Sequence, residues 1–472
     1  MLRNFIATSV VPFRLASHFL VVVLDGSMCS SDHLLVAEPL HAISCYYFPD
    51  GEQLKGGNFG SREFRRLVNV KTEVVLAIAK LGYDTLLVDG DIVFLRDPRP
   101  YLTSPEDVQI QRELGSTMNS GFFLVRASEW GLAFLGRALQ VASHPTEVGR
   151  VVMRQQEAVN RALVMMRRKR ATPLTVRVLP MEQFPNGVAY FERPFRRMFA
   201  YQNPCDECVI VHNNYIMGTP AKVYRFREHL LWRVDEPEGY YTSTQTRYLE
   251  FGNPNPEATL RQEVDALTTA FQLAAILDRV VILPPFHCHG CTSRSPGTMD
   301  AVVSTKKGKP QDARAMKRNG CSAARKEDDQ CNLSAHFSIT RLRSGMGMWP
   351  FRERMFRYNP LVPEDIRLRL IPLNDSVNDV DRLQPSPERP VAIHVDPGAP
   401  PVASPERVLR PGAPGVALTE DNIRDFFGRF QSERVLRFVD LYGVTLDESA
   451  PVFSSTKRKL HSSLRKSGLR SP

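Results

Sequence analysis

Two aspartates, Asp89 and Asp91, stand one residue apart at the end of a short apolar run, residues 85–88. Carboxylate oxygens are the ligands that Mg²⁺ and Mn²⁺ prefer in proteins. Two such side chains can face one cation if the chain bends between them, and we expect Gly90 to permit that bend. By itself an Asp-x-Asp sequence is more often an acidic turn on a solvated loop. The pair therefore needs support from other residues.

Three further residues could contribute to a metal or phosphate site. His212 follows an apolar run, and its imidazole could be a third metal ligand, although a lone histidine in that position is more often structural. Lys71 falls within the apolar stripe of a predicted helix, where a buried ammonium needs an anionic partner. The alternative is a lysine at the edge of the stripe whose ammonium reaches water. Together with Arg65, Lys71 is our candidate for binding a phosphate group.

The elements around these residues alternate apolar strands with amphipathic helices. This pattern predicts an α/β domain with a mostly parallel sheet and helices on both faces. A helix is predicted over 64–81, ended by Gly82, and strands at 19–24, 85–88, 122–125, 175–179 and 209–212. The strand 85–88 is expected to be buried. Asp89 and Asp91 would then follow its carboxyl end, where open α/β sheets bind ligands.

The pattern restarts after a stretch bearing proline and glycine at 235–239, which predicts a linker. A helix is predicted over 260–277, a strand over 280–283, and a last helix over 420–442. Long loops are expected at 292–335 and 385–415. We therefore predict a first domain at 1–235, a second, Rossmann-like α/β domain at 236–455, and a basic tail at 456–472.

The net charge of +10 lies in two segments, residues 306–329 and 456–472, which leaves the remainder near neutrality. Basic loops on a neutral body do not indicate a nucleic-acid partner, and we expect none. No apolar run approaches the length of a membrane span. Residues 2–24 also lack the uninterrupted hydrophobic region of a signal peptide.

Cysteine spacing favours disulfides over a zinc site, because the two close pairs lie about eighty residues apart. Unpaired thiols are a further alternative. The residues concerned are Cys205 with Cys208, Cys288 with Cys291, and Cys321 and Cys331. Two sequons, at Asn332 and Asn374, permit glycosylation. Together these features favour the secretory pathway.

The two aspartates belong to the sequence LGYDTLLVDGDIVFLRDP, residues 81–98, which is one of five ordered segments. The others are 64–65 with Lys71, 118–126, 183–187 with 190–191, and 211–215 with Gly218 and Lys222. Together they resemble the donor-site region of glycosyltransferase family 77 and its GT-A relatives. The resemblance covers about residues 19–235.

The resemblance implies a nucleotide-sugar donor, commonly a UDP-sugar, whose diphosphate is held by Mn²⁺ or Mg²⁺. It implies that Asp89, Asp91 and His212 are the metal ligands, and that Asn119 and Gly121 contact the sugar, although Asn-Ser-Gly is also good turn chemistry. The residues expected at the donor are Arg65, Lys71, Asp89, Asp91, Asn119, Gly121 and Lys222. Those expected to take part in catalysis are Asp91, Asn119 and Gln156.

The sequence departs from the family pattern in three ways. The family's Asp-Gln pair is Gln155-Gln156 here, with Asn160 in place and Glu157 close by, so the acid is missing. The family's first strand and its nucleoside-contacting residues should precede Phe19, and its membrane anchor is not found. We therefore expect the complete gene to extend upstream and to encode another strand-helix unit and a Golgi membrane anchor.

The second half resembles, more weakly, protein O-fucosyltransferases, through residues 252–255 and Arg261. Asp396 stands where that group has a functional arginine, so we expect this half to be structural or to bind the acceptor. The predicted function is metal-dependent transfer of a sugar, with retention, from a nucleoside-diphosphate donor to a glycan or glycoprotein. The alternatives are a catalytically inactive carbohydrate-binding or scaffolding protein, and a fucosyltransferase that uses the second domain.

Overall fold

The computed structural model describes residues 1–29, 43–48, 61–143, 153–168, 173–192, 205, 207–253, 255, 257–287, 330–331, 333–345, 351–368, 419–428, 430–438, 441–442, 444 and 446. Several predictions on the sequence lie outside them: the loop at 385–415, most of the loop at 292–335, the basic tail, Asp396, both sequons, and Cys288, Cys291 and Cys321.

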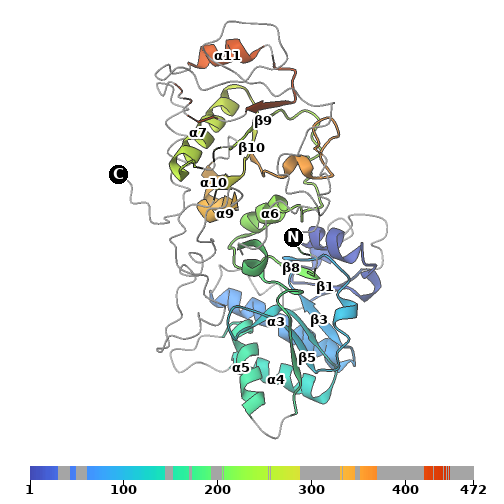
Figure 1. Cartoon of the computed structure of the whole chain (residues 1–472). Helices are drawn as coiled ribbons and strands as arrows, with labels where there is room; N and C mark the ends of the chain where they lie inside the picture. The colour runs from blue at the N-terminus through green and yellow to red at the C-terminus, as the bar shows by residue number, and fades with distance from the viewer. Residues whose placement is uncertain are drawn as a thin grey trace, which may run out of the picture. The chain divides into compact units, whose positions relative to one another are not determined.

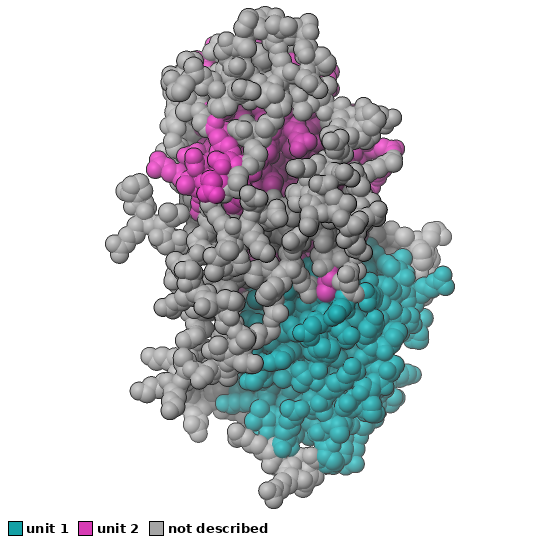
Figure 2. Space-filling view, viewed as in Figure 1, with its two compact units in different colours: residues 1–190, 206–215, 297–307 teal, residues 191–205, 216–296, 308–472 magenta. Residues whose placement is uncertain are grey.

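The chain forms two compact units, coloured separately in Figure 2. Among the described residues, unit 1 contains those of 1–190 and 206–215, and unit 2 those of 191–205, 216–296 and 308–472. Residues 216–235, which we placed in the first domain, thus lie in unit 2. The assignment of a separate role to each domain stays a prediction.

Unit 1 is built around a four-stranded sheet in the order β3-β6-β5-β7. Its strands are β3 (Thr85–Val88), β5 (Val108–Arg112), β6 (Met118–Val125) and β7 (Val176–Leu179). Figure 1 labels two of these strands, β3 and β5. The α/β class is confirmed, and the pairing is mixed: β6 runs antiparallel to β3 and β5, whereas β5 and β7 are parallel. Strand β3 is at the edge of this sheet and is half-buried, not buried as predicted.

The sheet separates two apolar layers, because successive side chains of a strand point to opposite faces. Phe123 and Val125 of β6 face the layer formed by three helices, α3 (Arg62–Lys80), α4 (Glu129–Ser143) and α5 (Gln155–Arg168). Phe122 and Leu124 face the opposite layer, which includes the chain start from α1 (Leu2–Phe5) to Val10. All four side chains are buried.

Helix α3 begins and ends at residues that the sequence marks. The Ser61 hydroxyl accepts a hydrogen bond of 3.1 Å from the backbone N–H of Phe64, which is an N-cap bond. Past the helix end, Gly82 has φ +90°, a conformation that glycine adopts without strain. The predicted helix and its stop at Gly82 are both confirmed.

Two smaller strand pairs complete the description of unit 1. β1 (Leu20–Val23) and β2 (Ser44–Tyr47) are parallel, and a disulfide joins Cys29 to Cys45. β4 (Ile92–Phe94) and β8 (Ile210–His212) are antiparallel. Elsewhere in the chain, Cys205 and Cys208 are also disulfide-bonded, as the cysteine pattern predicted.

Unit 2 contains an entirely parallel sheet in the order β13-β10-β9-β14. The strands are β9 (Tyr248–Phe251), β10 (Val280–Ile282), β13 (Phe351–Arg352) and β14 (Val435–Phe438). Between β9 and β10 lies α7 (Leu260–Ile276), whose N-terminus has a capping box formed by Thr259 and Gln262. The remaining elements are α6 (Thr219–Glu228), α9 (Leu333–His336), α10 (Ile339–Gly345) and the antiparallel pair β11 (Phe286–His287) and β12 (Gln330–Cys331).

The predicted last helix over 420–442 is wrong in its second half. Helix α11 spans only Glu420–Gly428, and residues 435–438 form β14 beside β9. Glycine disfavours continuation of a helix, and Val435, Leu436 and Phe438 gain burial in the sheet. Within the described residues, no helix has the length and apolar character needed to cross a membrane.

Helix α4 offers a test of packing with its own control. A Cβ built on Gly131 would lie 2.2 Å from the carbonyl oxygen of Arg126, whereas one on Gly136 meets nothing within 4 Å. We expect Gly131→Ala to lower the free energy of unfolding by about 1–3 kcal/mol through overpacking. Gly136→Ala should raise it by about 0.5–1 kcal/mol. Chemical denaturation of both variants checks this, and equal effects would contradict it.

Candidate metal centre

The pairing of β4 with β8 brings predicted metal ligands together. Asp89 follows the end of β3, and Asp91 precedes β4. In the antiparallel pair of β4 and β8, Ile92 lies opposite His212. The backbone N–H of Asn213 also donates a bond of 2.8 Å to the carbonyl of Asp91. Residues about 120 positions apart in the chain are thus held at one end of β3.

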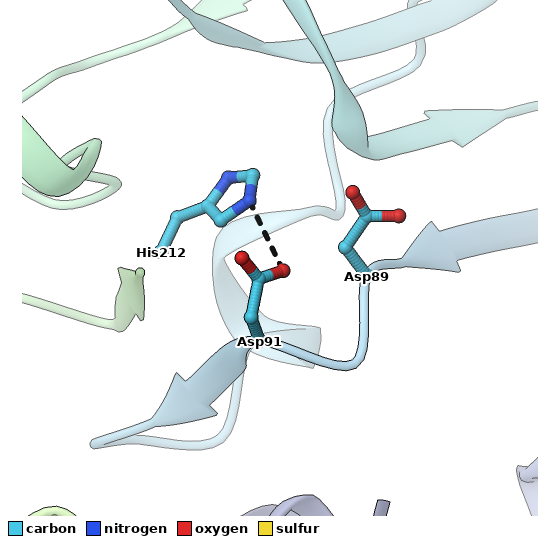
Figure 3. A group of neighbouring side chains, drawn as sticks. All are labelled: Asp89, Asp91 and His212. Carbon is cyan, nitrogen blue, oxygen red and sulfur yellow. Dashed lines mark ion pairs between the residues drawn. The ribbon is translucent and has the colours of Figure 1, made fainter. Parts of the chain in front are cut away.

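The three side chains converge (Figure 3). One ligand atom from each of Asp89, Asp91 and His212 lies within 4.8 Å of the other two. The distance between His212 Nε2 and Asp91 Oδ1 is 3.5 Å. Asp91 and His212 are buried, and Asp89 is half-buried. Among the described residues, this is the one group of three potential metal ligands that meets at a point.

The donor set fits a divalent cation. Two carboxylates and an imidazole offer the oxygen and nitrogen ligands that Mn²⁺ accepts, and carboxylates also suit Mg²⁺. Two buried or half-buried carboxylates side by side repel each other, so a cation between them removes an electrostatic cost.

The backbone of β6 closes one side of this group. A Cβ built on Gly121 would lie 2.6 Å from Asp89 Oδ2 and 2.7 Å from His212 Cε1. The N–H of Asp89 donates a bond of 2.7 Å to the Gly121 carbonyl. Glycine is thus required at 121 because of space.

Gly90, in contrast, does not have the role we expected. It is not among the residues with positive φ, and a Cβ built on it meets nothing within 4 Å. The bend between Asp89 and Asp91 therefore needs no conformation special to glycine.

Lys71 has an anionic partner although it is only partly buried, so the structure combines features of the two alternatives considered for it. Its Nζ forms an ion pair with Oδ1 of Asp89, and about a third of the lysine side chain is exposed. A lysine here places positive charge directly beside the acidic pair, where a diphosphate would also need it. Arg65 lies on the same helix and is half-buried, and its role at the donor stays a prediction.

Asn119 bridges two neighbours. Its amide nitrogen donates to Glu113 Oε1 at 2.8 Å, and its oxygen accepts from the N–H of Gly121 at 2.6 Å. Glu113 Oε1 also accepts from the Asn214 amide at 3.2 Å. Glu113 therefore links β6 with the segment that follows β8. A contact between Asn119 or Gly121 and a donor sugar stays a prediction.

Gln155 and Gln156 lie at the start of α5 and contact Ser120 of β6. The hydroxyl of Ser120 donates to Gln155 Oε1 at 2.7 Å, and its N–H donates to Gln156 Oε1 at 3.4 Å. Asn160 bonds both backbone groups of Met118 at 2.8 Å. The segment that lacks the family's acid thus supports the strand beside the metal ligands, and a catalytic role of Gln156 stays a prediction.

The remaining predicted residues lie in unit 2. Lys222 is on α6, and its role at the donor stays a prediction. Arg261 is 84% exposed and faces Asp265. The amide of Asn253 bonds Glu263 and the carbonyl of Pro285.

Sequence analysis did not identify two buried polar residues, Gln111 in β5 and Glu113 directly after it. Gln111 bonds Nδ1 of His212, and Glu113 bonds Asn119 and Asn214. The sequence signal for Gln111 is the alternation of apolar and polar residues at 108–111, and Glu113 is not part of it. Such alternation usually places polar side chains in solvent, whereas here Gln109 and Gln111 are both buried.

Comparison with known proteins agrees with this geometry. Residues 14–226 match the family model described as nucleotide-diphospho-sugar transferase. This part of the chain is a nucleotide-diphospho-sugar transferase domain, and the resemblance to glycosyltransferase family 77 is confirmed for it. The matched region contains all three potential metal ligands.

Similar curated proteins carry names of sugar transferases. "UDP-D-xylose:L-fucose alpha-1,3-D-xylosyltransferase 3" of Arabidopsis thaliana is 30% identical over 200 residues, 38% of this chain and 50% of its own length. "Beta-arabinofuranosyltransferase RAY1" of the same plant is 28% identical over 242 residues, 46% of this chain and 43% of its own. The chain thus spans about half the length of these relatives.

A third relative extends into the second half. "Arabinosyltransferase XEG113" of Arabidopsis thaliana is 23% identical over 427 residues, which cover 80% of this chain and 59% of the relative.

The two glycines of the metal centre give a matched pair of variants. Gly121→Ala would place a methyl group against Asp89 and His212, and we expect it to lower Mn²⁺ affinity about tenfold or more. Gly90→Ala, between the two aspartates, should leave the affinity within about twofold, because its Cβ has open space. Calorimetric titration with Mn²⁺ measures both. Equal affinities for the two variants would contradict the packing described for Gly121.

Glu113 gives a prediction on pH. Burial raises the pKa of this carboxyl above its usual range, against the opposing effects of the Tyr215 hydroxyl, His212 and the neighbouring amides. The folded protein then binds this proton more tightly than the unfolded chain, so stability is lost as the pH rises from the unfolded pKa through the folded one. Glu113→Gln removes that loss.

We expect the melting temperature of Glu113→Gln minus that of the parent to be larger at pH 8 than at pH 5. Each kcal/mol of difference in the free energy of unfolding should shift the melting temperature by about 2–4 °C. Glu157→Gln, at an exposed position, is the control and should show no such trend. Thermal unfolding in chelator at both pH values is the measurement; a difference independent of pH would refute the assignment.

Proposed function

We propose that this chain is a metal-dependent glycosyltransferase that moves a sugar from a nucleoside-diphosphate donor, a UDP-sugar, to a glycan or glycoprotein. The observation that carries the proposal is the convergence of Asp89, Asp91 and His212 at the end of β3, inside the nucleotide-diphospho-sugar transferase domain. The relatives whose printed names contain UDP-xylose and UDP-galactose support the choice of donor.

The residues of the site have separable tasks in this reaction. Asp89, Asp91 and His212 would hold Mn²⁺ or Mg²⁺, which when bound supplies positive charge to the leaving diphosphate. Lys71 adds a second positive charge beside Asp89. Gly121 lets the backbone of β6 approach the ligands closely. We further propose retention of the anomeric configuration, which rests on the family resemblance alone.

A catalytically inactive binding protein is the second candidate, since Gln155 stands in place of the family's acid. Glu113 weakens that argument. It is a buried carboxylate that accepts a hydrogen bond from Asn119, and Asn119 belongs to the segment expected to contact the sugar. A carboxylate is therefore available near this segment from the residue that follows β5, and we favour the enzyme.

We also propose a location in the Golgi. The disulfide between Cys29 and Cys45, and the disulfide-bonded Cys205 and Cys208, support an oxidising compartment.

The test is a screen of UDP-sugars for Mn²⁺-dependent hydrolysis and for transfer to fucosylated and arabinosylated glycans. Asp91→Asn keeps the size of the side chain but removes the charge, and we expect turnover to fall about 100-fold or more with the fold unchanged. Asp97→Asn, outside the group of three ligands, should stay within about threefold of the parent. Full activity of Asp91→Asn would exclude the metal assignment, and lack of turnover with every donor would favour the inactive candidate.

A further inference from the structure

The orientation of the Gln111 side chain is determined by its neighbours. Its amide nitrogen lies 3.0 Å from the carbonyl oxygen of Phe184 and 3.1 Å from that of Pro185. An amide nitrogen has two hydrogens, and each meets one acceptor. The reversed orientation would place Gln111 Oε1 against two carbonyl oxygens. Oε1 therefore points to His212.

The same contact determines where the proton of His212 lies. Gln111 Oε1 is 2.8 Å from Nδ1 of His212, and an amide oxygen can only accept a hydrogen bond. Nδ1 must then carry the proton. In the neutral ring, Nε2 keeps its lone pair, and this is the atom 3.5 Å from Asp91 Oδ1.

We propose that Gln111 is a positioning residue that holds His212 in the Nδ1–H tautomer, with Nε2 directed at the metal position. The presence of a metal beside His212 rests on the proposed function. The hydrogen bond between Gln111 and His212 is independent of that function. Partners of this kind orient a metal-binding histidine and make it a better ligand, and their loss typically lowers metal affinity 10- to 100-fold. His212 and Gln111 are both buried, so water cannot easily replace the amide.

Strand β5 contains a natural control. Gln109, two residues earlier, is equally buried, and its amide nitrogen also bonds two carbonyls, those of Leu102 and Ser104, at 3.0 and 2.7 Å. Its Oε1 accepts from Arg177 instead of a histidine. Replacing either glutamine by methionine therefore removes an amide bonded to two carbonyls. Only the change at Gln111 also removes a hydrogen bond to His212.

The first experiment compares Gln111→Met with Gln109→Met by Mn²⁺ titration, followed by calorimetry or electron paramagnetic resonance. We expect Gln111→Met to lower Mn²⁺ affinity about 10- to 100-fold and Gln109→Met to leave it within about twofold, at similar stability. Unchanged affinity in Gln111→Met, or an equal loss in Gln109→Met, would overturn the proposal.

The second experiment needs no folded variant of Gln111. In the metal-free parent at neutral pH, the ¹⁵N spectrum of the imidazoles should show His212 protonated at Nδ1 and unprotonated at Nε2, with the signal assigned by its loss in His212→Gln. A proton on Nε2 would overturn the tautomer and with it the proposal. If the parent binds no Mn²⁺, the metal part of the proposed function fails, and a spectrum with Nδ1 protonated would still establish the bond to Gln111.

Discussion

The antiparallel pairing of β4 with β8 is the interaction on which the candidate site depends. It is only three residues long on each strand, yet it places His212 beside Asp91. The pair is stabilised by the apolar layer around it, since Ile92, Phe94 and Ile210 are buried with Phe122 of the central sheet. Burial of these side chains thus determines the geometry of polar groups at the end of the strands.

Placing several acidic side chains close together has an electrostatic cost, and the neighbouring polar and basic groups offset it. Asp89, Asp91 and Glu113 are three acids gathered in one buried region, and each must be compensated. Asp89 has the ammonium of Lys71, and Glu113 has the amides of Asn119 and Asn214. Asp91 Oδ1 lies 3.5 Å from Nε2 of His212, so a cation at that point would bind both side chains.

Local signals were sufficient for the parts of the site that resemble a known pattern. The apolar run at 85–88 and the stop at Gly82 identified the strand, and the ordered segments identified Asp89, Asp91 and His212 as neighbours. Lys71 required a partner by burial alone, but its identity as Asp89 depends on how α3 lies on β3.

Other features depend on contacts between distant residues. The order β3-β6-β5-β7 with antiparallel neighbours depends on pairing across the chain, which spacing along the sequence does not encode. Gln111 and Glu113 look like ordinary polar residues in the sequence, because their burial depends on distant segments that cover β5 and the residue after it. The expectation for Gly90 was wrong, because a glycine between two aspartates suggested a backbone conformation special to glycine, and the structure does not need one there.

The disulfide between Cys29 and Cys45 has a consequence for handling the protein. It joins two cysteines 16 positions apart in the chain, and crosslinks over loops of about 15 residues contribute about 3 kcal/mol by restricting the unfolded chain. The strands that carry the metal ligands belong to other sheets. Material made in a reducing cytosol would therefore lose support around β1 first, while the end of β3 could keep its arrangement, so recombinant preparations of the same chain can differ with the redox history of the host.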